Sequence, residues 1–573
     1  MNTSRHFNAT LPFLFLGGIF LIMLSNVFYS WGWTDEAFYL STIHRMYCGD
    51  RLFLDEWSPT QTYAPLLYPF YALYLKINGN ADGIYLFFRI LTLVFQTATA
   101  CISYRILSKK HGKCVALAFA SLLMIFARAG ISGPSYYTFC LMYFSLGTLL
   151  IYAVFENKSA KQLMFAAGIF LALAVLCNPY LAMPYVVLSA AVLLVPQARK
   201  SWRLFLLCWL GTAISAVVYT ILFIPFDSFD DFLRSLHYIF NDPAYGRTPI
   251  LIFKSLIKCP RLLTFPYVLT YSPMIAALVI TEKKGIRNTK KTHFFLFALN
   301  TGLLVINIFA VRRGVESPVM ALSFYTLLAL ISSHGFRPSV WLTAYRAEIL
   351  YGIIPGLTLS YFFCLASDTG FGACAIGMCF ASFALFSILR DCYGSRRLFI
   401  IPMFAVLAST LFLRINATYR DSPLPFHLIF VPSMSKNAER ITEGSAKGLY
   451  TSKENKAQYD LVLDTIRALP CKDGDGLIVS QLIPWIFLER QELRCAAPTT
   501  WRLYLNDYRF EPYFTDFSGH HFPEFVLVID GSIIRDNNRA NKNNEESWLF
   551  DQLEQRDYIQ KQVPCGILYM KPQ

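Results

Sequence analysis

Residues 11–36 read LPFLFLGGIFLIMLSNVFYSWGWTDE, an uncharged apolar run that leads into the acidic pair Asp35 and Glu36. A helix that crosses a membrane needs about 20 apolar residues, and residues 11–29 supply such a run. Only Arg5 is charged before it, and no small-x-small cleavage site follows it, so we expect a retained anchor rather than a removed signal peptide. The sequence therefore predicts a membrane helix with two acids at its far end.

The same apolar pattern recurs through most of the chain. Its 573 residues are 55% hydrophobic and only 15% charged, which is too little charge to cover a soluble protein of this length. We therefore expect a polytopic α-helical membrane protein, with about thirteen spans in residues 1–415. The later spans are predicted near residues 83–106, 115–131, 136–155, 163–177, 180–195, 204–225, 263–280, 294–311, 319–332, 349–366, 371–389 and 399–413.

Basic clusters between the spans predict the direction of the chain. The positive-inside rule places Lys- and Arg-rich loops on the cytoplasmic side, and such clusters occupy every second loop. The net charge of +14 therefore indicates topology rather than nucleic-acid binding. The odd number of spans puts Asp35, Glu36 and the C-terminal residues together on the outer side. This result depends on a tight hairpin at Asn178-Pro179, because one long kinked helix there would turn three basic clusters outward. The basic clusters lie at residues 108–113, 156–161, 199–203, 282–291, 334–338 and 390–397.

Residues 416–573 change character and predict a soluble α/β domain on the extracytoplasmic side. Helical patterns near 453–469 and 545–554 alternate with strand-like runs at 476–480, 524–530 and 566–571. Asp473-Gly474-Asp475-Gly476 lacks the later glutamate of a calcium loop, so we expect a turn before a strand. None of the 14 cysteines forms a CxxC pair. Cys471 and Cys495 could form a disulfide in an oxidising compartment or remain free.

The first outer loop, residues 31–80, carries the most chemical information. An amphipathic surface helix is predicted over residues 37–47, with Phe38, Ile43, Met46 and Tyr47 on its apolar face. An acidic pair at a lipid interface loses hydration, which favours a functional role. The alternative is that Asp35 simply caps the helix.

The ordered set TDEAFYL, GD, P-L-x-Y and FFR resembles GT-C glycosyltransferases of the protein-mannosyltransferase type, which include the enzyme that adds aminoarabinose to lipid A. The resemblance is close over about residues 30–110 and architectural beyond them. One departure is Thr62-Tyr63-Ala64-Pro65, where the family often has Glu-Lys before Pro-Pro, so a lysine near the donor phosphate is missing. The matching residues are Asp35, Glu36, Gly49, Asp50, Pro65, Leu66, Tyr68 and Arg89.

This resemblance implies a GT-C-like fold and a site on the outer face of a membrane, by analogy a bacterial inner membrane. The family transfers a sugar from a polyprenyl-phosphate donor to a lipid, glycan or protein acceptor with inversion. It requires no cofactor, although some relatives bind a divalent metal. Asp35 would be the general base, and Glu36 would orient it or the acceptor. Arg89 by motif, and Arg128, Arg312 and Arg313 by position, are candidates for the donor phosphate. Substrate contacts are expected from Asp55, Glu56, Trp57, Tyr63 and Tyr68.

Each of these roles has a structural alternative. The arginines could form ion pairs with carboxylates or helix-end carbonyls, and the aromatic residues could be ordinary interfacial side chains. The acidic, aromatic loop at residues 226–249 could be a lid or an amphipathic surface helix. Rival functions are a transporter or flippase for lipid-linked sugars, an O-antigen-type polymerase or ligase, and a catalytically inactive relative. A transporter usually shows repeated halves and charges deep within its spans, and the sequence shows neither.

Overall fold

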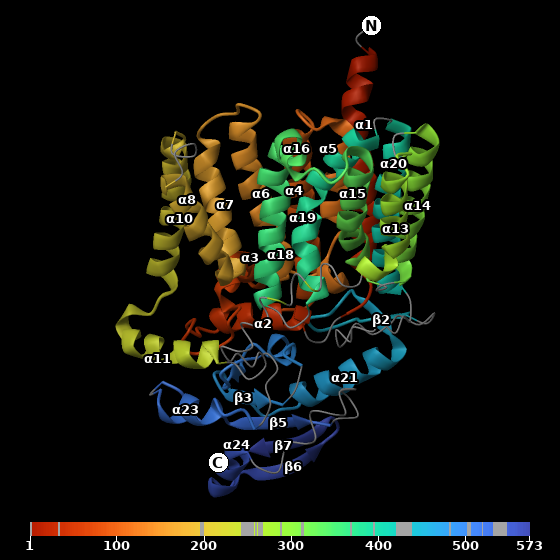
Figure 1. Ribbon diagram of the computed structural model, residues 1–573. Coiled ribbons are helices and arrows are strands. Elements are labelled where there is room, and N and C mark those ends of the chain that lie inside the picture. Colours follow the sequence, from red (N-terminus) through yellow and green to blue (C-terminus); the bar gives the residue numbers. More distant parts are fainter. Residues whose placement is uncertain are drawn as a thin grey trace.

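The computed structural model is a bundle of helices with a smaller α/β region packed against one end (Figure 1). It describes residues 3–31, 35–194, 200–241, 257, 261, 267–286, 289–310, 314–366, 370–393, 396–419, 438–480, 483–500, 506–517, 519–530 and 547–572. The helices of the bundle are α1 (Thr3–Asn26), α4 (Ile84–Leu107), α5 (Gly112–Ile125), α6 (Tyr136–Phe155), α7 (Leu163–Cys177), α8 (Ala182–Leu194), α10 (Trp202–Phe223), α13 (Ser272–Lys283), α14 (Lys290–Ala310), α15 (Ser317–His334), α16 (Pro338–Ala344), α17 (Arg346–Glu348), η5 (Ile349–Ile353), α18 (Ile354–Ala366), α19 (Phe371–Tyr393) and α20 (Arg396–Tyr419).

Every predicted span overlaps a helix of this bundle. Among the described residues, eight helices are long and apolar enough to cross a membrane, and four further apolar helices are shorter. α19 lies at the centre, with 94% of its most apolar stretch buried, whereas α10 lies at the edge with 11% buried. The apolar runs therefore form two kinds of helix, one packed inside protein and one whose side chains face outward.

The predicted hairpin at Asn178-Pro179 is confirmed by the position of α10. The ring of Phe155, the last residue of α6, lies 5.8 Å from the ring of Phe205 in the first turn of α10. α7 leads away from that end of the bundle, so α8 must return to it before α10 begins. The turn itself is capped locally, because Asn178 Oδ1 accepts a hydrogen bond from the Tyr180 amide at 3.3 Å. α7 and α8 are therefore two antiparallel helices rather than one kinked helix.

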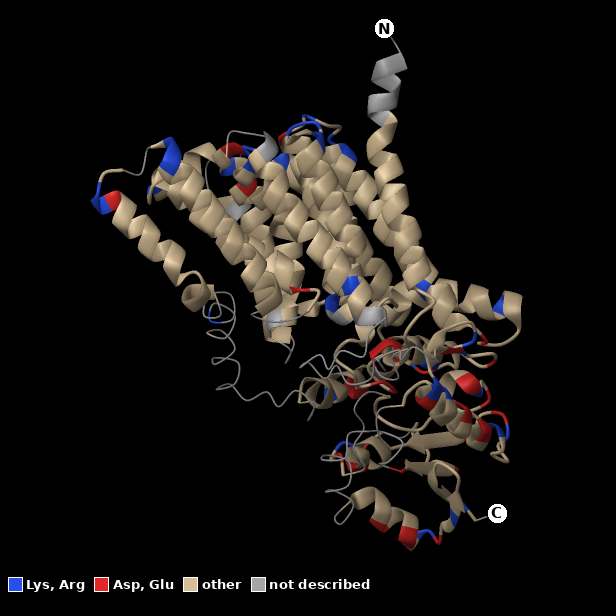
Figure 2. Cartoon of the chain, turned by 90° about the vertical axis from the view of Figure 1, so that its right-hand side faces the viewer, with Lys and Arg blue, Asp and Glu red and all other residues tan. Residues whose placement is uncertain are grey.

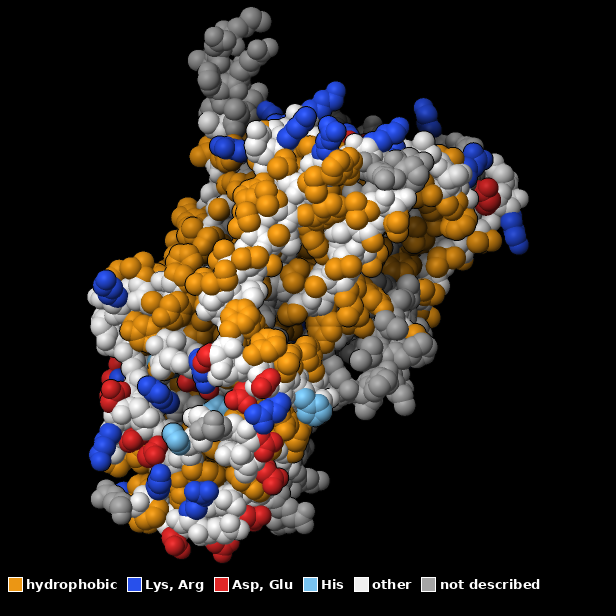
Figure 3. Space-filling view, turned by 90° about the vertical axis from the view of Figure 1, so that its left-hand side faces the viewer, with side chains coloured by type: hydrophobic (Ala, Val, Ile, Leu, Met, Phe, Trp, Pro, Cys, Tyr) orange, Lys and Arg blue, Asp and Glu red, His pale blue; other side chains and the backbone are white. Residues whose placement is uncertain are grey.

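Charge separates the two ends of the bundle. Lys and Arg gather at the end farthest from the C-terminal residues, while Asp and Glu gather in the α/β region (Figure 2). Hydrophobic side chains cover the surface between these ends (Figure 3). This is the arrangement that the positive-inside rule predicts for a chain whose N-terminus and basic loops share one side.

The C-terminal residues build a mixed five-stranded sheet with the order β4-β3-β5-β7-β6. β3 pairs in parallel with β4 and β5, whereas β7 pairs antiparallel with β5 and β6. The Ser452 hydroxyl caps α21, and Tyr459, Val462 and Ile466 point its buried face at the core. The elements are β1 (Ala438–Arg440), β2 (Tyr450–Ser452), α21 (Lys453–Arg467), β3 (Gly476–Val479), α22 (Ile486–Glu489), β4 (Arg494–Cys495), α23 (Phe510–Thr515), β5 (Phe525–Ile529), α24 (Trp548–Gln555), β6 (Ile559–Val563) and β7 (Gly566–Met570).

Two local expectations for this region can be compared with the structure. Gly474 adopts a left-handed φ of +88° and its amide donates to the Glu492 carbonyl at 2.8 Å, so the Asp-Gly repeat is a turn before β3. Cys471 and Cys495 are both free, so the disulfide that the sequence left open is absent from this structure.

The segment after α1 joins the two regions. The Ser30 amide donates to the Tyr450 carbonyl at 2.9 Å, and the Tyr450 amide donates to the Phe28 carbonyl at 2.8 Å. Residues that leave the first predicted span therefore pair directly with β2, which holds the α/β region against the end of the bundle where Asp35 lies.

Candidate active site

Helix α2 (Asp35–Tyr47) lies between the bundle and the α/β region (Figure 1). The sequence predicted a surface helix with one apolar face, but all ten residues from Glu36 to Arg45 are buried. The reason is that C-terminal residues cover the side of α2 that does not face the bundle. For example, the Ser41 hydroxyl donates to the Pro484 carbonyl at 2.6 Å. Tyr47, expected on the apolar face, is instead 40% exposed.

Glu36 and Arg89 form a buried two-pronged ion pair between α2 and α4. Arg89 Nε and Nη2 each lie 2.6 Å from one Glu36 carboxylate oxygen, and the two side chains are 3% and 4% exposed. Arg89 Nη1 donates to the carbonyls of Val27 at 2.8 Å and Tyr29 at 3.1 Å. The pair therefore fastens the start of α2 to α4 and to the end of α1. These contacts are the ones that the structural alternative for Arg89 describes, and its phosphate contact stays a prediction.

Asp35 lies in a different setting from its neighbour. It is half-buried at the first position of α2, and it interacts electrostatically with Arg128 and Tyr39. Arg128 belongs to the short helix η2 (Arg128–Gly130) between α5 and α6. Its guanidinium is buried and lies 3.7 Å from the centroid of the Tyr137 ring, a close cation–π contact. Arg128 is therefore close enough to interact with Asp35, the acid that the resemblance implies as a base.

Arg414 is a site residue that the sequence analysis missed. It lies near the end of α20, it is 5% exposed, and its Nη2 donates to the Ser132 hydroxyl at 2.8 Å. It interacts electrostatically with Arg89, Glu36 and Glu316. An arginine at the end of the last predicted span was the available signal, because a cation buried near lipid needs partners.

We call the six charged residues that meet here the α2 charge cluster. It contains three acids and three arginines, so its formal charge is balanced, as burial of charge requires. Gly133 allows the close approach, because a Cβ at that position would lie 2.5 Å from Glu36 Oε1. The members of the α2 charge cluster are Asp35, Glu36, Arg89, Arg128, Glu316 and Arg414.

Tyrosine rings line one side of the α2 charge cluster. The Tyr39 ring lies 5.7 Å from Tyr63 and 5.6 Å from Tyr136, both edge to face. Tyr63 is 1% exposed, so its ring packs inside the protein rather than offering a face for sugar stacking. Burial raises the pKa of the Tyr39 hydroxyl, and the nearby Asp35 raises it further, so Tyr39 stays protonated. Tyr68, in α3 (Ala64–Asn78), is half-buried against the core.

Asp55 and Glu56, for which substrate contacts were expected, both have partners within the protein: Asp55 joins the first outer loop to the α/β region, and Glu56 pairs with Arg45 inside that loop. Glu56 pairs with the buried Arg45 at 2.9 Å, and burial raises the pKa of its carboxyl. Asp55 accepts a hydrogen bond from His520 Nε2 at 2.9 Å. Although burial alone would raise it, the bonds from His520 and the Arg51 amide hold the pKa of Asp55 below its ordinary value. Both acids therefore have partners that act as structural ties.

Trp57 is the centre of an aromatic cluster rather than an exposed stacking platform. It is completely buried, and its ring stacks on Tyr238 with a centroid distance of 4.8 Å and an interplanar angle of 8°. Tyr513 and Phe517 meet it edge to face at 5.0 and 5.1 Å. The indole nitrogen donates to the Leu54 carbonyl at 2.8 Å. Trp57 thus packs the first outer loop against two other segments, one that contains Tyr238 and one that contains Tyr513 and Phe517.

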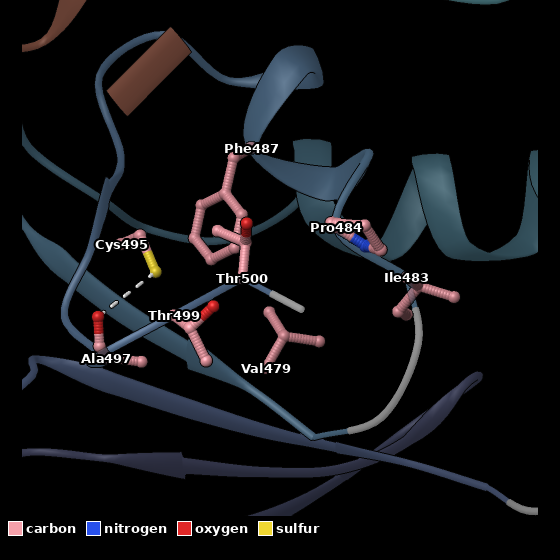
Figure 4. A pocket seen from close by; sticks show the side chains of 8 residues that line it. All are labelled: Val479, Ile483, Pro484, Phe487, Cys495, Ala497, Thr499 and Thr500. Carbon is pink, nitrogen blue, oxygen red and sulfur yellow. Dashed lines mark hydrogen bonds between the residues drawn. The ribbon is translucent and has the colours of Figure 1, made fainter. Parts of the chain in front are cut away.

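A small pocket opens at the carboxyl ends of the parallel strands β3 and β4 (Figure 4). This edge of an open α/β sheet is a common ligand position. Here, however, the same segment contacts α2, because Arg45 Nη1 donates to the Ala497 carbonyl at 2.9 Å. Its walls are apolar apart from two threonine hydroxyls, so the pocket offers little for a charged ligand. The lining residues are Val479, Ile483, Pro484, Phe487, Cys495, Ala497, Thr499 and Thr500.

Two further expectations concern metal binding and the paired arginines at the end of α14. In the part of the chain that the structure describes, no three His, Cys, Asp or Glu side chains form a group that could hold a metal ion. Arg312 and Arg313 lie outside the described residues, so the structure says nothing about their proposed phosphate contact.

No family model matches this sequence, and no curated protein matches it. Solved structures with a similar arrangement include an Archaeoglobus fulgidus oligosaccharyltransferase tethered to an acceptor peptide, at 14% identity and a TM-score of 0.47, covering 90% of this chain and 69% of that one. The same protein in complex with zinc and sulfate aligns at 15% identity and a TM-score of 0.46, over 90% and 67% of the two chains.

A third similar structure is ArnT from Cupriavidus metallidurans in the apo state, with 12% identity and a TM-score of 0.40. The alignment covers 99% of this chain and 100% of that one.

Proposed function

We propose that this protein is a membrane glycosyltransferase that moves a sugar from a polyprenyl-phosphate carrier to an acceptor hydroxyl in one inverting displacement. The carrying observation is the difference between two adjacent acids. Glu36 uses both carboxylate oxygens on Arg89, whereas Asp35 is half-buried in the same cluster near Arg128. Such a reaction needs a positioned base, and the Glu36–Arg89 pair beside Asp35 would hold that base in position.

In this proposal Asp35 accepts the proton of the acceptor hydroxyl as the hydroxyl oxygen attacks the anomeric carbon. The bond from that carbon to the carrier phosphate breaks, and the phosphate leaves with the electron pair. A positioned general base contributes about 10²–10⁴-fold in rate. Glu36 and Arg89 hold the first turn of α2, and with it Asp35, in place.

Arg128 and Arg414 are the proposed counter-charges for the departing phosphate. Both belong to the α2 charge cluster and both are buried there. The planar guanidinium matches phosphate oxygens and cannot lose its charge at neutral pH. They would take over from the lysine that the family often carries and that this sequence lacks at Thr62-Tyr63. Arg312 and Arg313 remain candidates by position.

The proposal includes the location and the partners of the protein. Residues 1–415 would form the membrane part and residues 416–573 an extracytoplasmic part, in the inner membrane of a bacterium. The contact between α2 and the C-terminal residues, opposite the basic end of the bundle, supports a shared outer side. The acceptor would be a lipid, a glycan or a protein, and the reaction as written needs no metal.

The test is transfer from a radiolabelled polyprenyl-phosphate sugar by purified full-length protein. We expect Asp35→Asn to fold as the wild type does and to lose about 10²–10⁴-fold in transfer rate. Asp82→Asn is the matched control, since Asp82 lies just after the first outer loop and its carboxylate forms a surface ion pair with Lys447 at 3.6 Å. Asp35→Asn that transfers at the wild-type rate would exclude the proposed base.

The same preparation separates the proposed transferase from a flippase. Wild-type protein in sealed vesicles should form product only when an acceptor is present. Movement of labelled donor across the bilayer without any acceptor, unchanged in Asp35→Asn, would instead support the flippase function.

A further inference from the structure

Helix α11 (Phe229–Phe240) follows α10 through the short helix η4 (Phe226–Ser228) and lies across the end of the bundle (Figure 1). At 100° per residue, its side chains fall into three faces. One face points into the protein, one exposes polar residues and one exposes large apolar residues. A helix bound only to protein and water would need two of these faces, so the third requires an explanation.

The protein face of α11 is firmly attached. Ile239 is buried in the cluster around Trp57, and Tyr238 stacks on Trp57. The Phe232 ring meets the Phe53 ring edge to face at 5.3 Å. These contacts fix the rotation of α11 about its own axis, and therefore fix the direction in which its other faces point.

The apolar exposed face consists of Phe229, Leu233 and Phe240, which are 44%, 51% and 60% exposed. Their positions i, i+4 and i+11 lie within about 40° of one another around the helix. Phe226, in the preceding turn, is 60% exposed. Large apolar side chains gathered in this way mark a contact surface rather than ordinary exposure to water.

The polar exposed face lies directly beside the apolar one. This face consists of Asp230, Arg234 and His237, which are all exposed. At 100° per residue they lie about 80–140° around the helix from Phe229. An exposed apolar stripe bordered by an exposed polar stripe is the pattern of a helix that lies in a membrane surface.

The helix that precedes α11 also exposes large apolar side chains. Val217, Val218, Ile221 and Leu222 of α10 are between 49% and 67% exposed, and only 11% of the apolar stretch of that helix is buried. In a membrane these side chains face lipid. α11 begins at the residue after η4 ends, so its exposed apolar side chains follow closely on the lipid-facing helix α10.

We propose that α11 is an interfacial helix whose face Phe226, Phe229, Leu233 and Phe240 inserts into the membrane surface. Its other side holds Trp57, so this contact seats the first outer loop and the α/β region at a defined height above the lipid. The segment carries three acids, Asp227, Asp230 and Asp231, against one arginine. Insertion is therefore driven by apolar area rather than by attraction to anionic headgroups. This inference does not depend on the proposed enzyme activity.

The experiment places a nitroxide on the full-length protein in phosphatidylcholine nanodiscs. Leu233→Cys samples the apolar face, and the adjacent Arg234→Cys is the matched control on the polar face. A second pair, Phe229→Cys and Asp230→Cys, repeats the comparison one turn earlier. The described native cysteines are buried or half-buried, and labelled wild-type protein gives the background. Collision with oxygen, which concentrates in lipid, is compared with collision with a water-soluble nickel chelate.

We expect positions 233 and 229 to collide more with oxygen than with nickel, and positions 234 and 230 to show the reverse. Addition of anionic phosphatidylglycerol should leave the ratio at 233 unchanged. Nickel access at 233 equal to that at 234 would put the whole helix in water and overturn the proposal. Protection of 233 from both reagents would also overturn it, because it would mean that protein covers the face.

Discussion

Arg89→Leu separates a structural arginine from a phosphate-binding one. The substitution removes both bonds to Glu36 and the donors to the Val27 and Tyr29 carbonyls. Removing one partner of a buried ion pair costs about 3–5 kcal/mol, because the other charge stays buried without compensation. The unpaired carbonyls add to this loss. We therefore expect a large decrease in the free energy of unfolding of the protein.

The assay is chemical denaturation of purified protein followed by tryptophan fluorescence, with donor affinity measured on the same samples. Glu36→Leu combined with Arg89→Leu removes both charges, so the double variant should lose less stability than the sum of the single variants. Arg105→Leu is the control on the same helix, because Arg105 is exposed and its guanidinium lies 5.7 Å from the centroid of the Phe13 ring, near the limit of a cation–π contact. It should cost less than about 1 kcal/mol.

Arg89→Lys sharpens the comparison. Lysine keeps the positive charge but cannot bond both oxygens of Glu36 in the same fork, so a structural arginine should be rescued poorly. The reasoning is refuted if Arg89→Leu is as stable as Arg105→Leu while donor affinity falls and Arg89→Lys restores it. That outcome would return Arg89 to the phosphate site implied by the resemblance.

Two further predictions concern the contact of Trp57 between the two regions and a buried acid of the α/β region. Trp57→Ala should destabilise the protein by about 3–5 kcal/mol and release the C-terminal residues to limited proteolysis. Trp202→Ala, at an exposed position, should do neither. Equal cleavage of the two variants would contradict the inference that Trp57 holds the two regions together. Burial raises the pKa of Glu489 to about 7 from 4.5. Between these two pH values the folded state therefore binds more protons than the unfolded state. The free energy of unfolding should fall by up to about 3 kcal/mol as pH rises from 4.5 through 7. Glu489→Gln should flatten the stability curve in this window, and a wild-type curve that is already flat would show that the Glu489 carboxyl is not perturbed.

The membrane helices and the main strands could be predicted because each has a local signature. An apolar run of sufficient length forms a helix in lipid whatever surrounds it, since every backbone group must be paired internally. β3, β5 and β7 were visible as apolar runs. β4 spans only Arg494–Cys495, and β6 is exposed along most of its length, so neither has an apolar pattern to detect.

The candidate site was only partly predictable. The acidic pair after the first span was visible as Asp35 and Glu36, but two adjacent carboxylates look alike in a sequence. α2 was expected at a surface because half of its pattern is apolar, yet the C-terminal residues cover its polar side. Arg414 was overlooked because nothing near it in the chain marks its partners.

The sequence by itself determined that the protein is a bundle of membrane helices, that basic clusters recur in every second loop, and that two acids follow the first helix. These properties depend on hydrophobicity, length and loop charge, which are local. Only the tertiary structure decided that Glu36 is bound to Arg89, 53 residues away, that Asp35 lies with Arg128, and that Trp57 packs beneath α11. Such pairings depend on which helix ends lie next to each other in the folded protein, and contacts between distant residues have no local sequence pattern.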